Sequence, residues 1–321
     1  MIQQNAAWGT VLTYLETSHV NSLENDYQRA TARIKSDDRK LIEDNPHDIA
    51  DTKYGNNILL TENAGKGTLY VGIIGAQRSN NTGIDGIADN VQIMTLRVEP
   101  SEGEPYPKDI ALAIRYAVDN GADIIQLSSP CDITPLDEAQ WVNEALQYAE
   151  SKNVLIVQPV ADRSFDMDEY PFFPNRNISD TKTLTTMITV AASDIAGNPL
   201  PDTNFGIKSL DLYAPGKDIY SSYVGNTYRS VSGSEIAAAM VTGVAALIKS
   251  YFPKLTAQQI KKAIAENVTD RSGTVVEKQM ATIKDYSEKQ IKDLFSFEDL
   301  CASSGILNAA KAVEAASKLS K

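Results

Sequence analysis

The chain has 321 residues, of which 42% are hydrophobic, so it is long enough to bury one large core as a single α/β domain. Its formal net charge of -12 argues against nucleic acid and anionic membrane surfaces as partners, because both favour clustered lysine and arginine. Two cysteines, Cys131 and Cys301, provide no disulfide framework, and we expect free thiols.

The N-terminus shows no basic segment followed by an apolar core, so no signal peptide is visible. Two interpretations stay open: an intracellular protein, or an exported one whose leader is absent from this chain. We expect no membrane-spanning segment.

The first predicted element is a short strand over residues 11–15, which Glu16 follows. Loops after the strands of an open parallel sheet line its ligand crevice, so Glu16 is a candidate site residue. Residues 23–41 are charged with helical spacing of apolar residues, and residues 45–57 are rich in turn residues. The stretch from about 20 to 60 is therefore interpreted as a charged insertion of helix and surface loop.

Acidic clusters occur in this insertion and at residues 166–169. Their oxygens are of the kind that calcium prefers. Without a defined ligand loop, a solvated surface is the favoured interpretation, so we expect no cofactor, with structural calcium as the weaker alternative.

An alternation of strands and helices fills the middle of the chain. Strands are predicted over residues 91–98, 122–128 and 154–160, and helices over 109–120 and 136–152. Before them, residues 65–76 form an apolar run bounded by glycines, which suits either a strand or a buried helix. The alternation predicts a doubly wound, mainly parallel sheet with helices on both faces.

One apolar helix organises the rest of the chain. Residues 232–248 open with small polar capping residues, place Glu235 at the positive end of the helix dipole, and then stay apolar on every face. The run is shorter than the roughly 20 residues that span a bilayer, so we expect it at the centre of a domain. Strands over 188–193, 210–216 and 219–222 precede it; a helix from Thr256, a polar insertion over 271–292 and a final helix over 308–319 follow.

Two of these stretches resemble motifs of the subtilisin-like serine peptidases, the subtilases. Ser232-Gly233-Ser234-Glu235-Ile236-Ala237 is similar to the family's Ser-Gly-Thr-Ser-Met-Ala signature, and Lys66-Gly67-Thr68-Leu69-Tyr70-Val71-Gly72 is similar to its His-Gly-Thr-His-Val-Ala-Gly helix. The resemblance covers about residues 11–316 and implies one subtilisin-like domain over 1–321, with a helix at 65–76. Residues 109–122 look like those of exported bacterial subtilases, which implies an exported bacterial protein without its leader.

The catalytic positions depart from the family pattern. By the resemblance, Glu16 stands where the family has the aspartate that orients the histidine, Lys66 stands at the general-base histidine, and Glu235 stands at the nucleophilic serine. Asp162 stands at the asparagine that donates to the oxyanion. A glutamate has no attacking hydroxyl, a lysine beside carboxylates is held protonated, and a carboxylate opposes a developing negative charge.

The strand that pairs with the substrate backbone in subtilases corresponds to Ser128, Ser129 and Pro130. A proline there has no N–H to donate and restricts the residue before it, which weakens an extended-peptide groove.

These departures predict a pseudopeptidase, a subtilase-fold module that binds a protein or peptide, or holds an assembly together, without cutting. Glu16, Lys66 and Glu235 are expected to form a carboxylate–ammonium–carboxylate cluster. In a simpler interpretation, Glu235 sits on the helix dipole and Lys66 points to solvent. The alternative function is a hydrolase that uses Glu16, Asp162 and Glu235 as acid and base.

Overall fold

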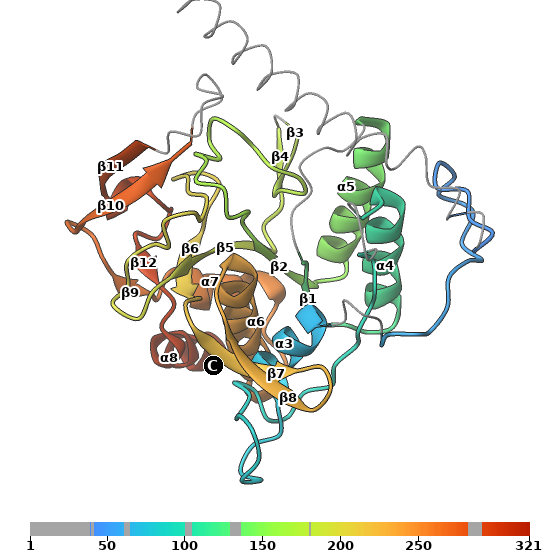
Figure 1. Ribbon diagram of the computed structural model, residues 1–321, viewed down its shortest axis with the longest axis horizontal. Coiled ribbons are helices and arrows are strands. Elements are labelled where there is room, and N and C mark those ends of the chain that lie inside the picture. Colours follow the sequence, from blue (N-terminus) through green and yellow to red (C-terminus); the bar gives the residue numbers. More distant parts are fainter. Residues whose placement is uncertain are drawn as a thin grey trace, which may run out of the picture.

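The computed structural model describes residues 39, 42–60, 65–99, 105–128, 136–179, 181–281 and 291–321. Its main sheet has the strand order β1-β2-β5-β6-β12-β9 (Figure 1). The pairs from β1 to β12 are parallel, and β9 pairs with β12 antiparallel. The strands are β1 (Ile124–Gln126), β2 (Leu155–Pro159), β5 (Met187–Ser193), β6 (Leu212–Pro215), β9 (Thr269–Asp270) and β12 (Gly305–Ile306).

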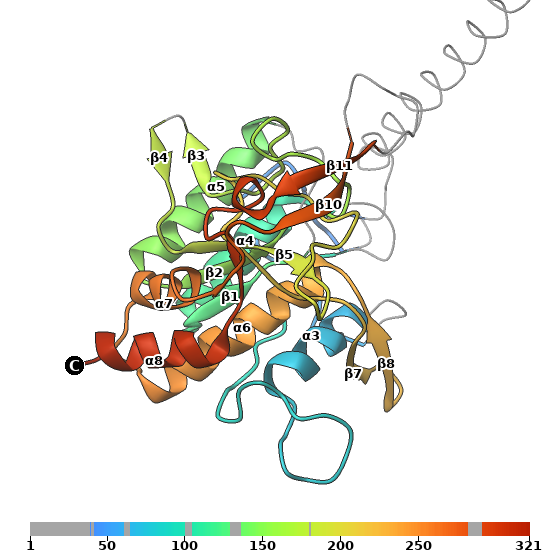
Figure 2. The same ribbon diagram turned by 90° about the vertical axis from the view of Figure 1, so that its left-hand side faces the viewer.

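Helices cover both faces of this sheet, because successive apolar side chains of its strands point to opposite faces and both sets must be buried. Leu155 and Val157 of β2 join one hydrophobic cluster with residues of α6, α7 and α8, whereas Ile156 between them packs with α4 and α5. Figure 2 shows α6, α7 and α8 on one side and α4 and α5 on the other. The helices are α4 (Pro107–Asp119), α5 (Leu136–Ser151), α6 (Ser234–Tyr251), α7 (Ala257–Ala265) and α8 (Ala309–Leu319). The predicted doubly wound, three-layer α/β fold is confirmed.

The apolar run over residues 65–76 forms a helix, α3 (Gly65–Gly75), which packs beside α6 and a β-hairpin. The hairpin consists of β7 (Ile219–Tyr223) and β8 (Thr227–Val231). A side chain at Gly72 would lie 2.3 Å from Ser222 Oγ and 2.5 Å from Ser221 Oγ, so the close approach of helix and hairpin requires glycine there. This packing holds α3 against the hairpin.

The predicted strand over residues 91–98 is wrong. The segment has no regular secondary structure and belongs to no ladder of the described sheet, and Ile93 and Met94 are each 43% exposed. β-branched and aliphatic residues fit a strand only when neighbouring strands cover them, so the apolar pattern alone was insufficient. The strand expected over 122–128 also shortens to the three residues of β1.

The polar insertion expected over 271–292 contains a β-hairpin, formed by β10 (Val275–Met280) and β11 (Ile291–Ser296). Val276 and Lys278 on its inner face are buried, and Val276 joins a hydrophobic cluster with Phe205 and Tyr213. The remaining short elements are a β3–β4 hairpin (Asn177–Ser179 and Lys182–Thr183) and a 3-10 turn over Phe297–Asp299. No helix among the described residues is long and apolar enough to cross a membrane.

The strand expected over residues 11–15 and most of the helix expected over 23–41 lie outside the described residues. Residues 45–57 form turns and irregular chain, as the turn-rich sequence predicts. The segment is more than surface loop, however, because Asp44 beside it is only 8% exposed and pairs with the fully buried Lys108 of α4.

Candidate functional site

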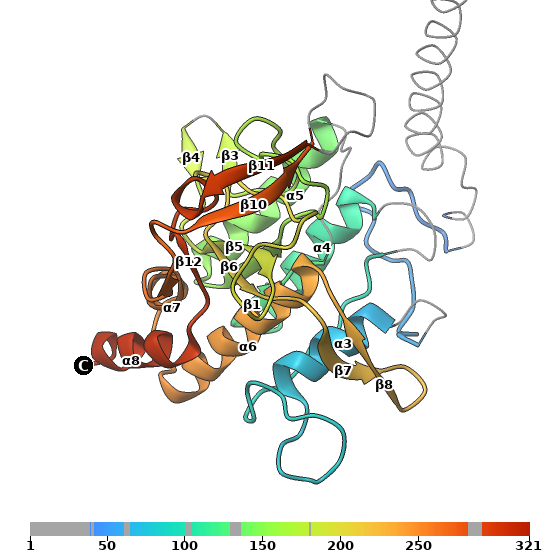
Figure 3. The ribbon, with the colours of Figure 1, turned by 60° about the vertical axis from the view of Figure 1, so that its left-hand side comes forward.

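Lys66 lies in the first turn of α3 and Glu235 in the first turn of α6, and their side chains form an ion pair. Figure 3 shows α3 beside α6 and the β7–β8 hairpin. Lys66 Nζ lies 3.3 Å from Glu235 Oε1 and 3.7 Å from Glu99 Oε2. A carboxylate in the first turn of a helix is favoured by the helix dipole, whereas a cation there is disfavoured. The helix dipole therefore stabilises the Glu235 carboxylate, whereas the Lys66 ammonium is stabilised by the two glutamates that face it.

Tyr70 completes the contacts of Glu235. It lies one helical turn after Lys66, and its hydroxyl donates a hydrogen bond to Glu235 Oε2. Burial, reinforced by the adjacent Glu235 carboxylate, raises the pKa of Tyr70 far above its ordinary value, so the phenol stays protonated and acts as a donor. One carboxylate oxygen of Glu235 thus contacts a cation and the other contacts a hydroxyl.

The protonation state of Lys66 follows from its neighbours. Partial burial lowers the pKa of Lys66, but the carboxylates of Glu235 and Glu99 outweigh burial, and the net pKa is raised. Lys66 therefore remains an ammonium at neutral pH and cannot accept a proton as the histidine of a serine peptidase does.

Asp162, which follows the carboxyl end of β2, caps α6. Its Oδ2 accepts a hydrogen bond from Ser234 N at 3.0 Å, and its Oδ1 accepts one from Ser234 Oγ at 2.6 Å. Gly233 precedes the helix with a φ of 139°, a conformation that side chains disfavour, and this lets the carboxylate approach the helix terminus. The carboxylate therefore occupies the anion-binding end of the central helix.

The electrostatics of Asp162 follow from this position. Asp162 is exposed as a residue, but its carboxylate points inward onto the buried Ser234. Desolvation of the carboxylate raises the pKa of Asp162, and this effect exceeds the lowering by the Ser234 hydrogen bonds. Ser234 Oγ also lies 2.6 Å from Thr203 Oγ1. Ser234 is fully buried and engaged with two partners, so its hydroxyl is not presented as a nucleophile.

The structure thus brings Lys66 into contact with Glu235 and joins Asp162 to the neighbouring Ser234. Three of the predicted site residues, Glu16, Ser129 and Pro130, lie outside the described residues, as does Cys131. Ser128 is half-buried two residues beyond the end of β1.

The structure also gives the surroundings of titratable groups outside this site. His47 is exposed and its Nδ1 lies 2.9 Å from Glu138 Oε1, so it belongs to the contact with α5. Asp168 accepts the Lys208 N–H through both carboxylate oxygens, at 2.9 and 3.2 Å, which holds a loop together. Within the described ranges no three or more His, Cys, Asp or Glu side chains converge as metal ligands. Cys301 is a buried free thiol.

Sequence reasoning missed Glu99 and Tyr70. Tyr70 carried a usable signal, because it follows Lys66 at the i+4 spacing of a helix face. Glu99 carried only a weak signal, its place directly after the strand predicted over 91–98, and nothing in the sequence paired it with Lys66.

Comparison with known proteins places these features in a family. The model of the "Subtilase family" matches residues 13–282. Thermitase from Thermoactinomyces vulgaris is 33% identical over 211 residues, covering 65% of this chain and 69% of thermitase. A thermophilic serine proteinase from Bacillus sp. (strain AK1) is 32% identical over 208 residues, covering 65% of this chain but 48% of that protein, so this chain spans about half of that relative.

Solved structures agree on the fold. The A-subunit of the AB5 toxin from E. coli has a TM-score of 0.61 at 21% identity, covering 80% of this chain and 79% of that chain. The prenylagaramide maturation protease PagA has a TM-score of 0.50 at 26% identity, covering 68% and 71%. The family match extends over more than half of the residues, so the chain belongs to the subtilase family.

Proposed function

We propose that this chain is a catalytically inactive subtilase that binds a protein or peptide without cleaving it. The observation that carries the proposal is the state of Glu235, which occupies the nucleophile position by resemblance. Its carboxylate is held between the Lys66 ammonium at 3.3 Å and the Tyr70 hydroxyl. With a carboxylate at the nucleophile position and an ammonium at the base position, the pair offers neither the serine hydroxyl nor the neutral base that acyl transfer requires.

The oxyanion position supports the same proposal. Hydrolysis by a serine peptidase needs a donor aimed at the oxygen that becomes negative. Asp162 is an acceptor, and its two oxygens are already occupied by the N–H and hydroxyl of Ser234. An incoming carbonyl oxygen would meet a carboxylate where the family presents an amide.

A hydrolase with carboxylate chemistry is the competing proposal. It requires one carboxyl group that is free to exchange a proton with substrate and a second that stays ionised. Glu235 is instead paired with an ammonium that stays charged at neutral pH, and Asp162 is directed toward the helix terminus. These contacts favour the inactive module.

The test is incubation of the purified chain with a diverse peptide library over a range of pH, read by mass spectrometry. Glu235→Ala serves as the matched variant, and thermitase serves as the active control. We expect no cleavage by either form of this chain. Cleavage that Glu235→Ala lacks would establish carboxylate chemistry and overturn the proposal.

The binding half of the proposal is tested on the same library. Peptides that co-elute with the chain on size exclusion are identified after denaturation and remeasured individually by fluorescence polarisation. We expect saturable binding that weakens when Lys66 is changed to Glu, because that change reverses the charge at the site. Binding that is unaffected by Lys66→Glu would place the binding surface elsewhere.

A further inference from the structure

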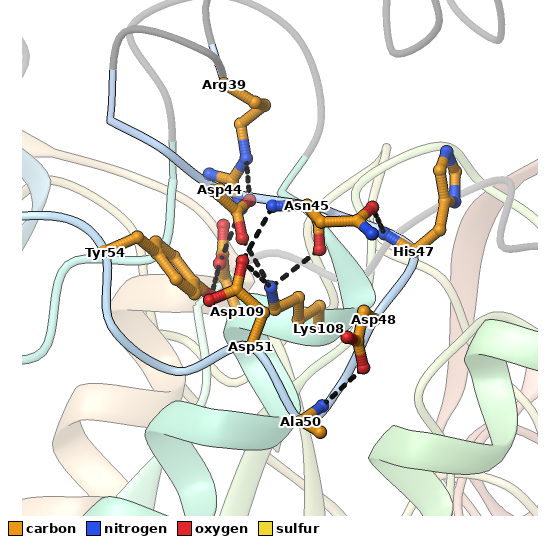
Figure 4. Close-up of polar contacts among 10 residues, drawn as sticks. All are labelled: Arg39, Asp44, Asn45, His47, Asp48, Ala50, Asp51, Tyr54, Lys108 and Asp109. Carbon is orange, nitrogen blue, oxygen red and sulfur yellow. Dashed lines mark hydrogen bonds and ion pairs between the residues drawn. The ribbon is translucent and has the colours of Figure 1, made fainter.

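A second polar cluster lies outside the candidate site, at the start of α4. The side chains of Lys108 and Asp44 are both fully buried and form an ion pair (Figure 4). Lys108 Nζ also donates to the Asn45 carbonyl at 2.8 Å and lies 3.8 Å from Asp51 Oδ2. A buried ammonium is tolerated only when such partners surround it, so the segment that carries Asp44 to Asp51 is fixed onto α4.

Tyr54 and Arg39 enlarge this cluster at its edges. The Tyr54 hydroxyl donates to Asp109 Oδ1 at 2.5 Å. Lys108 Nζ lies over the Tyr54 ring, 4.4 Å from its centroid, in a cation–π contact. Arg39 Nη2 lies 2.8 Å from the same Asp109 oxygen. Figure 4 shows these side chains converging on Lys108 and Asp109 from the segment that runs ahead of α3. The segment is therefore held by tertiary contacts up to Tyr54.

Immediately after Tyr54 the chain becomes exposed to solvent. All six residues from 55 to 60 are exposed, and the last three are aliphatic: Ile58 is 58%, Leu59 47% and Leu60 77% exposed. The backbone there belongs to no helix or strand, and Ile58 N donates locally to Asn56 Oδ1 at 2.9 Å. Five residues after Leu60, the chain is fixed again in α3, where Gly65 and Gly72 approach the β7–β8 hairpin.

An endopeptidase needs an exposed segment that can adopt an extended conformation in its active site without unfolding the domain. Residues 55–60 meet that requirement between two fixed ends. We propose that residues 55–60 are a processing site for endopeptidases that prefer aliphatic side chains, and that the Lys108 cluster keeps the N-terminal fragment bound after the cut. In the cut, water is added across one peptide bond, leaving a carboxylate on the N-terminal fragment and an ammonium on the other.

The proposal is independent of whether the subtilase site is active, and it is tested on the full chain. Dilute thermolysin, an endopeptidase with aliphatic preference, is added to the native protein, and the first products are identified by intact mass. We expect the first cut within residues 55–60. The two fragments should then co-elute on native size exclusion and separate only in denaturant. A first cut elsewhere, or a fragment that leaves the native wild type, would overturn the proposal.

Matched variants test the two parts separately. Replacing Leu59 and Leu60 with Asp should slow the first cut at least tenfold, because the aliphatic side chains are lost without change to the Lys108 cluster. After nicking, Lys108→Met should release the N-terminal fragment at least tenfold faster than Lys53→Met, which removes an exposed lysine from the same neighbourhood. Equal release by these two variants would contradict the anchoring role.

If Lys108→Met fails to fold, Tyr54→Phe decides the anchoring claim. This variant keeps the ring over Lys108 and loses only the hydrogen bond to Asp109. We expect it to fold and, once nicked, to release the fragment several-fold faster than Lys53→Met. Release at the Lys53→Met rate would overturn the claim.

Discussion

Replacing Lys66 with methionine tests whether its ammonium stabilises the contact between α3 and α6. The variant keeps most of the aliphatic stem and removes only the charge. It leaves the carboxylates of Glu235 and Glu99 facing each other without the cation that lies 3.3 and 3.7 Å from them. The variant therefore loses the attraction between the ammonium and the two acids.

The exposure of the three side chains sets the magnitude. Exposed ion pairs contribute about 0.2–1 kcal/mol, and removing one partner of a buried pair costs about 3–5 kcal/mol. Lys66 is 52% exposed, Glu99 30% and Glu235 23%, so solvent screens the cluster in part. We expect Lys66→Met to lower the free energy of unfolding by about 1–2 kcal/mol at pH 7.

The pH dependence separates charge from packing. The raised pKa of Lys66 means that its stabilisation persists through neutral pH and is lost only as pH rises above the ordinary value of 10.5. As that charge is lost, the difference in stability between wild type and variant should shrink. Urea unfolding at pH 7 and above pH 10.5 measures this, with the exposed Lys254→Met as control. Equal midpoints for Lys66→Met and wild type at pH 7 would refute the reasoning.

Two further predictions follow from the same region. Because burial raises the pKa of Asp162 above 3.8, the native state holds its proton more tightly than the unfolded chain, and wild type should lose stability as pH rises from 3.8 through the native pKa. Asp162→Asn should flatten that slope in thermal unfolding, and unchanged slopes would contradict the assignment. Gly72→Ala should cost about 1–3 kcal/mol through its clash with Ser221 and Ser222, whereas Gly67→Ala, with open space around it, should stabilise α3 by up to about 1 kcal/mol. Similar unfolding midpoints for these two variants would show that the helix and hairpin do not meet closely.

Much of the fold was predictable because its signals are local. Three examples are the apolar helix with Glu235 in its first turn, the helix capped by Thr256, and the apolar run of β5. In each, the apolar pattern, the length and the terminating residues lie in one stretch of sequence. Thr256 accepts from Gln259 N, and Gln259 returns the bond, so the cap is a complete capping box. Elements of this kind need no knowledge of their neighbours.

The errors and omissions concern features that depend on neighbours. Residues 91–98 have the composition of a strand, but composition does not supply a partner strand. The hairpin around Lys278 looked like a polar insertion, because a buried lysine is recognised only once its Nζ is seen to donate to the Pro201 carbonyl at 2.7 Å. The same holds for Lys108, whose Asp44 partner lies 64 residues earlier in the chain.

The candidate site was predicted in part from the family resemblance, which placed Lys66 beside Glu235. The structure adds Glu99 as a second acid facing Lys66 and shows the Asp162 carboxylate joined to Ser234. Neither contact can be read from spacing, since each joins residues about 30 or more positions apart that meet only where strands and helices of the folded domain converge.

The most direct test of inactivity is labelling with a fluorophosphonate, which forms a covalent adduct with an activated serine. The folded chain and thermitase are incubated with the probe under the same conditions, and intact masses are compared. We expect thermitase to gain one adduct and this chain to gain none, because the resemblance puts Glu235 at the nucleophile position and Ser234 is buried between Asp162 and Thr203. A stoichiometric adduct on any serine of this chain would contradict the account.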